Sequence, residues 1–313
     1  MNAISRRTAL LGAAGAAAAL PLALPGCAAP RTERRLALAC GEPGGVYLDF
    51  GELLSAELAR DGHPPLRLRE TFGSGENASL LAAGAVDLAL ALADTAELPG
   101  PDVTAIGRVY QNYLQCVVRS DSGIAELADL GGTAVSIGAP GSGASLTTRR
   151  LLEVQGLGPA QAGTRARELP IGEAIAELAA GRISALFWSG GLPTPLLAEL
   201  TETTPLALID LGDALPGLAA RYPDRYLTTR IPSGVYPGTG ATTTIGIPNY
   251  LLARPSLPDA TAAALVGVLI DRAEALVPGG AVGIQFLTPA SLIETGEIPL
   301  HPGAAAEYRR RYG

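Results

Sequence analysis

The sequence contains no lysine, and all 23 of its basic residues are arginine. A Schiff-base lysine is therefore excluded, and so is a Walker A phosphate loop, which requires Gly-Lys-Ser/Thr. The 30 acidic residues outnumber the basic ones and leave a net charge of −7. An acidic chain without a basic run is a poor match to nucleic acid or to an anionic membrane surface. We expect no nucleic-acid partner.

Histidine and cysteine, which build most metal sites and many nucleophilic centres, are also scarce. The two histidines, His63 in "DGHPP" and His301 in "PLHPG", lie in turns. Neither has a second histidine at the i, i+4 spacing of a helical zinc site. Cys40 and Cys116 lie in apolar strand-like runs, where they could pair outside the cytoplasm or remain as two small buried thiols. We predict neither a metal site nor a cofactor.

The N-terminal segment has a basic start followed by an apolar run over residues 9–24. This is the pattern of a signal peptide, and the run is short and alanine-rich for a membrane span. "SRRTALL" resembles a twin-arginine export signal, and "LPGC" resembles a bacterial lipobox with Cys27 as the acylated residue. We predict a signal peptide over 1–27 and a tether over 28–35. The chain would then be extracytoplasmic, lipid-anchored to the outer face of the cytoplasmic membrane, or periplasmic if Cys27 is cut away or inert.

Strand and helix patterns alternate along the rest of the chain. Short apolar runs such as "RLALAC" (35–40) and "TAVSIG" (133–138) are typical of buried strands. Longer runs such as "VYLDFGELLSAELARDG" (46–62) and "ATAAALVGVLIDRAEALV" (260–277) have the spacing of helices. This alternation predicts an α/β fold with mostly parallel strands.

One local pattern occurs twice, as "SLLAAGAVDLALAL" (79–92) and "AELAAGRISALFW" (176–188). In both copies a helix stops at a glycine, which suits a left-handed cap, and an apolar strand begins shortly after. The repetition indicates two lobes built alike. We predict that residues 36–119 and 244–313 form lobe 1 and residues 120–243 form lobe 2. The chain would cross near Arg119 and return near Thr243.

Five small, polar loops follow the predicted strands. They are "CGEPGGVYLDFG" (40–51), "FGSGENAS" (72–79), "LADTAE" (92–97), "GAPGSGAS" (138–145) and "FWSGGLPTP" (187–195). In open α/β sheets, ligands bind beyond the carboxyl ends of the strands. Glycine lets backbone N–H groups approach an oxygen ligand, and a helix N-terminus adds about half a positive charge. The loops therefore favour a site that holds a small anion; a tight connection between elements is the alternative for each loop.

The loops do not contain the motifs of common α/β enzymes. A nucleophile elbow reads Gly-x-Ser-x-Gly, but Pro140 precedes Ser142 at the glycine position and Phe72 precedes Ser74. The Gly-x-Gly-x-x-Gly fingerprint of dinucleotide binding is also missing from residues 137–145. Nothing in the sequence supports an enzyme.

We predict contacts to a ligand from each of these loops. Tyr47 and Trp188 would form aromatic walls from opposite lobes, although either could instead pack in its own lobe. The full set of candidates is Gly44, Gly45, Tyr47, Ser74, Asn77, Asp94, Gly141, Ser142, Gly143, Ser145, Trp188, Gly190 and Gly191. No arginine lies in the loops to clamp a carboxylate in bidentate fashion, and Arg108, just before "VYQNY", is the nearest basic candidate.

The loops and their surroundings resemble the TAXI receptors, the TRAP-associated extracytoplasmic immunogenic solute-binding proteins. The matching segments are "GGVY" (44–47), "SGENASLLAAGAVDLAL" (74–90), "GAPGSGAS" (138–145), "ALFWSGGLPTP" (185–195), "IPSGVYPG" (231–238), "TIGIPNYLL" (244–252) and "LHPGAAAEY" (300–308). The sequence departs from the family at Leu48–Asp49, where a second Tyr and a Pro are usual. It departs again at Ala144–Ser145, where Thr and Glu are common. These departures bear on the choice of ligand more than on the fold.

The resemblance implies a type II periplasmic-binding-protein fold, in which hinge strands join two α/β lobes and the ligand lies in the cleft. It implies a small organic anion as ligand, a dicarboxylate or an amino acid such as glutamate or 2-oxoglutarate. The partners would be the membrane permease subunits of a TRAP transporter. One alternative is a receptor that regulates a membrane sensor kinase. A remote alternative is an enzyme of the same fold related to pyrimidine-precursor synthesis, which would need a catalytic His or Lys in the cleft.

Overall fold

The computed structural model describes residues 35–96, 103–158 and 163–313. The predicted signal peptide, Cys27 and the tether before residue 35 lie outside the described residues. Within the described part, no helix combines the length and the apolar character needed to cross a membrane.

Ten strands in the described residues form one hydrogen-bonded sheet in the order β2-β1-β3-β10-β4-β7-β5-β6, with β8 paired to β4 and β9 paired to β10. The strands are β1 (Ala37–Ala39), β2 (Arg67–Arg69), β3 (Leu88–Leu92), β4 (Thr104–Arg119), β5 (Ala134–Ser136), β6 (Arg165–Arg167), β7 (Ala185–Gly190), β8 (Leu206–Leu208), β9 (Leu227–Ile231) and β10 (Thr242–Ala253). β2, β1 and β3 are parallel to one another, and so are β6, β5 and β7. The two central strands, β4 and β10, are antiparallel to each other and to these neighbours.

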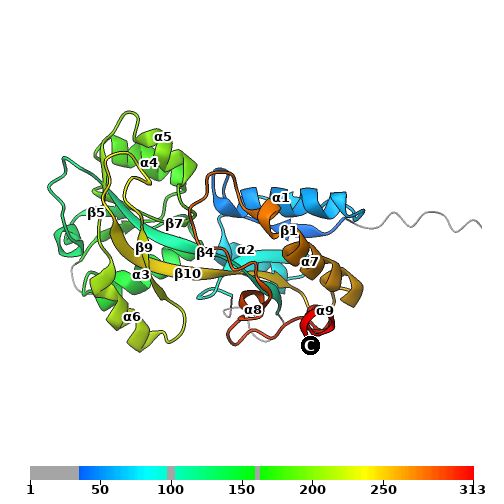
Figure 1. The fold of residues 1–313 in the computed structure, drawn as a ribbon. Coiled ribbons are helices and arrows are strands. Elements are labelled where there is room, and N and C mark those ends of the chain that lie inside the picture. Colours follow the sequence, from blue (N-terminus) through cyan, green and yellow to red (C-terminus); the bar gives the residue numbers. More distant parts are fainter. Residues whose placement is uncertain (1–34, 97–102, 159–162) are drawn as a thin grey trace, which may run out of the picture. The chain divides into compact units, whose positions relative to one another are not determined.

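The helices are α1 (Val46–Arg60), α2 (Ser74–Ala82), α3 (Gly143–Val154), α4 (Ile171–Ala179), α5 (Pro195–Leu200), α6 (Leu215–Arg221), α7 (Asp259–Asp271), α8 (Pro289–Leu292) and α9 (Pro302–Tyr312). Short 3-10 helices lie at η1 (Leu127–Leu130), η3 (Gly212–Ala214) and η4 (Ala273–Leu276). In Figure 1, β4 and β10 run side by side between two groups of elements. We call β1–β3 with α1, α2 and α7–α9 the first half, and β5–β9 with α3–α6 the second half.

The two central strands belong to both halves. β10 pairs with β3 over residues 249–253 and with β9 over residues 242–246. β4 pairs with β7 and β8 only from Tyr113 onward. The pairing register of β10 with β4 shifts at Asn249/Tyr250, directly after Pro248, which fits the tendency of proline to sit at irregular points of a strand. The predicted lobe boundaries at Arg119 and Thr243 stay predictions.

The internal repeat of the sequence corresponds to two units with the same position in the two halves. In the first, α2 leads to β3, which lies between β1 and β10; in the second, α4 leads to β7, which lies between β5 and β4. The helices of both units end beside glycines with left-handed backbone, Gly84 at φ 67° and Gly181 at φ 68°. An L-residue with a side chain rarely adopts this conformation, so the glycines end the helices. The prediction of two α/β units built alike is confirmed.

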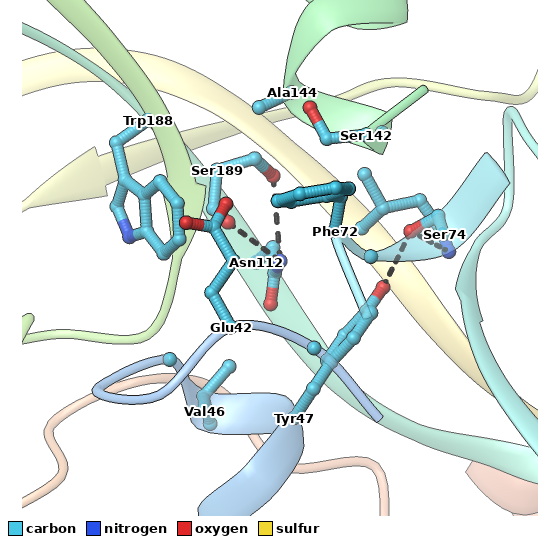
Figure 2. A pocket seen from close by; sticks show the side chains of 15 residues that line it. Glu42, Val46, Tyr47, Phe72, Ser74, Asn112, Ser142, Ala144, Trp188 and Ser189 are labelled. Atoms are coloured by element: carbon cyan, nitrogen blue, oxygen red, sulfur yellow. Dashed lines mark hydrogen bonds between the residues drawn. The ribbon is translucent and has the colours of Figure 1, made fainter. Parts of the chain in front are cut away.

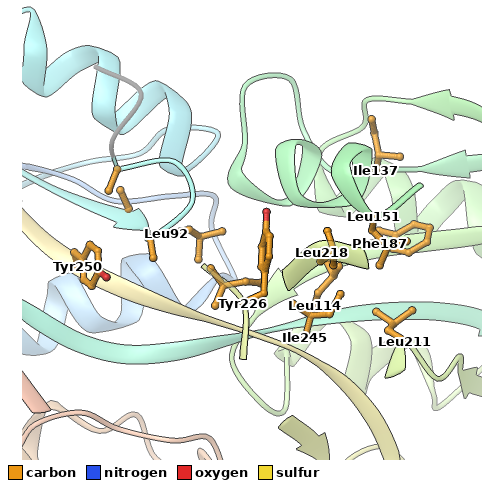
Figure 3. Close-up of a cluster of buried hydrophobic side chains, with 14 of the residues drawn as sticks. Leu92, Leu114, Ile137, Leu151, Phe187, Leu211, Leu218, Tyr226, Ile245 and Tyr250 are labelled. Carbon is orange, nitrogen blue, oxygen red and sulfur yellow. The ribbon is translucent and has the colours of Figure 1, made fainter. Parts of the chain in front are cut away.

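One cluster of buried hydrophobic side chains extends across both halves. It includes Leu92 on β3 of the first half, Tyr250 on the central strand β10 and Phe187 on β7 of the second half. Figure 3 shows Tyr226 between Leu92 and Leu218 in this cluster. Two other large clusters each lie mainly within one half, one around Phe50 and the other around Leu197. The shared cluster packs the halves together in addition to the two central strands.

Some elements differ from the sequence-based expectation. β4 begins at Thr104, well before the apolar strand-like run around Cys116, "LQCVV" (114–118), where the sequence pattern predicts a strand. The earlier part contains Arg108, Gln111 and Asn112, which interrupt the hydrophobic run; Gln111 and Asn112 are buried and hydrogen-bonded. α5, α6, α8 and β9 are further elements that the sequence pattern does not predict, because they are short or lie in Gly- and Pro-rich sequence.

Candidate functional site

A small cavity lies where the carboxyl ends of the parallel strands from both halves meet. The space that a water centre can reach inside it is about 40 Å³. Six of the predicted ligand-binding residues line it, namely Gly45, Tyr47, Ser74, Ser142, Gly143 and Trp188. The remaining lining residues are Gly41, Glu42, Val46, Phe72, Gly73, Leu92, Asn112, Ala144 and Ser189. Figure 2 shows this space with its lining residues, ten of which are labelled.

Three helices begin at the cavity wall. Gly45 precedes α1, Gly73 precedes α2 and Ser142 precedes α3, and all three residues line the cavity. The first N–H groups of a helix have no partner within the helix, and the helix dipole places positive potential there. Within the described residues, the amides of Gly143 and Ala144 have no hydrogen-bond acceptor. The wall therefore carries backbone donors and positive potential without any basic side chain.

Glycines let the two halves come close together around the cavity. A Cβ atom on Gly75 would lie 2.4 Å from the carbonyl oxygen of Gly141, across the boundary between α2 and the loop before α3. A Cβ atom on Gly143 would lie 2.8 Å from the Ser74 hydroxyl oxygen. Both distances are shorter than a van der Waals contact allows. The glycine-rich loops thus serve the close approach of the halves as well as the exposure of backbone N–H groups.

Several predicted site residues lie beside the cavity rather than on its wall. Gly44 faces the Leu196 side chain of the second half, and Gly191 faces Val46 of the first. Gly190 leaves room for the Trp188 indole, whose nitrogen would be 2.3 Å from an added Cβ atom. Gly141 lies in a neighbouring, more open groove that shares Phe72 with the cavity.

The side chains of Asn77, Ser145 and Asp94 have partners away from the cavity. Asn77 is fully buried and donates to the carbonyl oxygens of Cys40, which follows β1, and of Leu90, within β3, so it links these two strands of the first half. The Ser145 hydroxyl donates to Glu168 at 2.8 Å, and the Ser145 amide donates to the Ser142 hydroxyl that caps α3. None of these three residues lines the cavity.

Asp94 connects the halves through a buried polar network. It follows β3 of the first half, and it accepts hydrogen bonds from Thr147 at 2.7 Å and from Tyr226 at 2.9 Å, both in the second half. The Arg150 guanidinium lies 3.7 Å from the same carboxylate. Burial raises the pKa of the Asp94 carboxyl, and these hydroxyl and guanidinium groups oppose the rise. Asp94 therefore holds the halves together on one side of the cavity.

A chain of hydrogen bonds passes from the first half to the second under the cavity. The Tyr47 hydroxyl lies 2.8 Å from the Ser74 hydroxyl and donates to the side-chain oxygen Oδ1 of Asn249, on β10, at 2.5 Å. The Asn249 amide donates to Asn112 on β4, and the Asn112 amide donates to the Ser189 backbone oxygen on β7. Burial raises the pKa of the Tyr47 phenol well above its usual value, so the phenol stays protonated. Ser74, Tyr47, Asn112 and Ser189 all line the cavity, so the chain couples its wall to both central strands.

Glu42 is the carboxylate on the cavity wall. It comes from the loop before α1, and its Oε2 accepts a hydrogen bond of 3.0 Å from the Ile171 amide at the start of α4 in the second half. Burial raises the pKa of the Glu42 carboxyl, the Ile171 amide lowers it, and Glu173 raises it. None of the arginines in the described residues lines the cavity. Arg108, the nearest basic candidate from the sequence, pairs with Glu294 and lies over the Phe286 ring.

Glu42, Phe72, Asn112 and Ser189 are lining residues that the sequence analysis does not single out. Glu42 and Phe72 lie inside predicted loops. An acidic or aromatic side chain beside a glycine-rich turn is a sequence signal that could have identified both as site candidates. Asn112 gives no such signal, because it lies within β4, ahead of the predicted strand. Ala144, one of the two positions that depart from the TAXI pattern, lines the cavity, whereas Ser145 does not.

Neither histidine lines the cavity, and neither do Cys40 and Cys116, the two cysteines within the described residues. His301 is buried and its Nδ1 accepts from Gly303 at the start of α9, and His63 is exposed. Cys40 and Cys116 are free and buried, and burial raises the pKa of the Cys40 thiol to about 12. The described residues contain no group of three or more His, Cys, Asp or Glu side chains that could hold a metal ion.

Known structures share this architecture. The Tv2483 protein bound to L-arginine aligns with 81% of this chain and 93% of its own, at 14% identity and a TM-score of 0.51. A protein from Bordetella bronchiseptica RB50 aligns with 79% of this chain and 76% of its own, at 16% identity and a TM-score of 0.51. The alkanesulfonate-binding protein SsuA from Xanthomonas axonopodis pv. citri, bound to MOPS, is 18% identical over 88% of this chain and 83% of its own, with a TM-score of 0.48.

At these identities the likeness concerns the fold. The predicted fold class, a type II periplasmic-binding-protein fold with two α/β lobes joined by strands, is confirmed. The model of the NMT1-like family matches residues 38–310. Since this match covers most of the sequence, the chain belongs to the NMT1-like family.

Proposed function

We propose that this protein is an extracytoplasmic solute-binding protein that holds a small organic anion in the cavity between its halves. The observation that carries the proposal is the convergence of three helix N-termini on one cavity wall. Backbone N–H groups and helix dipoles bind an anion without reacting with it. The solute we propose is a dicarboxylate or an amino acid such as glutamate or 2-oxoglutarate.

The cavity limits how such a solute enters. Its space of about 40 Å³ admits only a few atoms, so a dicarboxylate needs the walls to move apart. β4 and β10 connect the halves as continuous strands, and bending of such strands is a way in which two lobes open and close. We propose that the solute binds to an open form and that the halves then close around it.

The destination of the solute follows from the resemblance to the TAXI receptors. We propose that the protein delivers its solute to the permease subunits of a TRAP-type transporter, and that the lipid on Cys27 keeps it at the membrane. Neither histidine lies on the cavity wall and the sequence has no lysine, so the proposal involves binding without catalysis.

The test is a solute screen on the purified protein. Native mass spectrometry of protein isolated without refolding would detect a retained solute. A screen of carboxylates, amino acids and sulfonates would follow, with the melting temperature and the Trp188 fluorescence as readouts. Since Trp188 is the sequence's one tryptophan and lines the cavity, a bound solute should change both readouts. A complete screen with neither response would contradict the proposed site.

A further inference from the structure

The cavity wall combines two opposite electrostatic features. Three helix N-termini favour an anion, yet the Glu42 carboxylate lies on the same wall. Figure 2 shows the Glu42 carboxylate directed into the space that Trp188 and Phe72 flank. A plain dicarboxylate would bring two negative charges toward this carboxylate, and like charges at close range repel strongly where water is excluded. A ligand that satisfies the whole wall must therefore carry charge of both signs.

The contacts of Glu42 leave it able to bind a cation. Its Oε2 accepts from the Ile171 amide, and its Oε1 has no hydrogen-bond partner among the described residues. Glu173, at the third position of α4, is the other charged group that acts on Glu42. Glu173 is also acidic, and within the described part of the chain Glu42 forms no ion pair with a cationic side chain.

We infer that the solute is an α-amino acid, whose ammonium group donates to Glu42 and whose carboxylate accepts from the helix N-termini. This inference rests on the proposed function and selects one class among its solutes. The Trp188 ring, which flanks the same space, can add a cation–π contact to the ammonium. Glu42 is then a specificity-determining residue, because it distinguishes an amino acid from the 2-oxo acid of the same skeleton.

Capping of α4 alone is the competing role for Glu42. A side-chain oxygen that accepts from a first-turn amide stabilises a helix whatever the ligand. The substitution Glu42→Gln separates the two roles, because the glutamine amide oxygen can still accept from Ile171 while the negative charge is lost. A matched control is Glu173→Gln, which removes one nearby negative charge from an exposed position off the cavity wall.

The experiment measures dissociation constants by calorimetry for the L-amino acids and for their matching 2-oxo acids, beginning with glutamate and 2-oxoglutarate. For the wild type we expect at least one amino acid to bind about 10-fold or more tightly than its 2-oxo acid. Glu42→Gln should weaken that amino acid roughly 10- to 100-fold, as expected for the loss of a charged hydrogen bond. The same variant should leave the 2-oxo acid unchanged or slightly tighter, and Glu173→Gln should change neither by more than about 3-fold.

Three results would overturn the inference. Equal or tighter binding of the 2-oxo acid by the wild type would overturn it and leave the proposed anion site standing. An equal loss of both ligands in Glu42→Gln would show that Glu42 acts only through α4. Absence of binding by every amino acid and every 2-oxo acid would overturn it too, and the wider solute screen would then decide the proposed function separately.

Discussion

α2 and α4 are equivalent helices of the two halves, yet their N-termini make different contacts across the cavity. Both begin with a Gly-Glu pair at the second and third positions, and both lead into a buried strand. At α2, Gly75 is pressed against the Gly141 backbone of the second half. At α4, the first amide receives the Glu42 carboxylate of the first half. The same local sequence thus makes a backbone contact with the opposite half at α2 and a contact with a charged side chain at α4.

The residues that follow β3 and β7 also make different contacts with the opposite half. β3 is followed by Asp94, which bonds to Thr147 and Tyr226 of the second half. At the equivalent place after β7 stands Gly191, which has no side chain and lies against Val46. One repeat unit therefore provides a buried carboxylate that hydrogen-bonds to the opposite half, and the other provides a glycine against which a side chain of the opposite half packs. The repeat preserves the framework, while single residues at its ends decide how the halves meet.

The largest effect should come from removing the buried carboxylate with Asp94→Ala. The Tyr226 hydroxyl would then lose its acceptor, and the Arg150 guanidinium would lose the carboxylate that faces it at 3.7 Å. Thr147 would keep only the Gly143 carbonyl oxygen as an acceptor. Breaking a buried ion pair by removing one member costs about 3–5 kcal/mol. Urea unfolding should therefore show a lower free energy of unfolding by this amount. Asp121→Ala is the control, because Asp121 pairs with Arg119 at an exposed site; equal losses in the two variants would show that the Asp94 network contributes nothing special.

A smaller effect, on binding more than on stability, is expected for Gly75→Ala. The new Cβ atom would lie 2.4 Å from the Gly141 oxygen, so the halves could not meet as they do here. Its matched control is Gly172→Ala, at the equivalent position of α4, where an added Cβ meets nothing within 4 Å. Alanine in place of glycine favours a helix by up to about 1 kcal/mol.

Comparing the two alanine variants separates an effect on the closing of the halves from an effect on helix propensity. Both variants gain helix propensity, but only Gly75→Ala should bind solute more weakly, by roughly 10-fold, since about 1.4 kcal/mol lost from the closed form corresponds to that factor. Calorimetry would measure affinity and thermal melting would measure stability. If Gly172→Ala weakens binding as much as Gly75→Ala does, the contact between Gly75 and Gly141 does not control closure.

The smallest effect concerns pH. Burial raises the pKa of Glu42, so protonation begins at a higher pH than for an exposed glutamate. A protonated carboxyl does not pair with an ammonium, and amino-acid affinity should fall as the pH decreases from 7 toward about 4.5. The stability of the ligand-free protein should depend on pH in the opposite direction. A raised pKa stabilises the folded state at low pH, and that contribution is lost as the pH rises through the folded-state pKa. Glu42→Gln should remove both dependences; an unchanged pH profile of binding would exclude Glu42 as the titrating group.

The fold could be predicted from the sequence to a large extent, because apolar periodicity and glycine caps are local signals. The repeat at 79–92 and 176–188 appears as α2–β3 and α4–β7 with the expected strand pairing. The early part of β4 was missed for a physical reason. Gln111 and Asn112 look unsuited to a buried strand until their hydrogen-bond partners in distant segments are known.

The candidate site was predictable by loop but not by residue. Tyr47, Ser74 and Trp188 do line the cavity, whereas Asn77 and Asp94 face partners elsewhere. A polar residue after a strand can point to a ligand, to its own half or to the opposite half. Only the positions of the partners distinguish these three outcomes.

By itself, the sequence determined the framework of this protein: alternating strands and helices, glycine-rich turns after the strands, and chemistry without lysine. These properties depend on spacing and composition, which local physics converts directly into structure. The tertiary structure alone decided that Glu42 caps a helix of the opposite half, that Asp94 ties the halves together and that Asn249 and Asn112 join them under the cavity. Such contacts link segments far apart in the chain, and hydrogen bonds of this kind form only where folding brings both partners out of water.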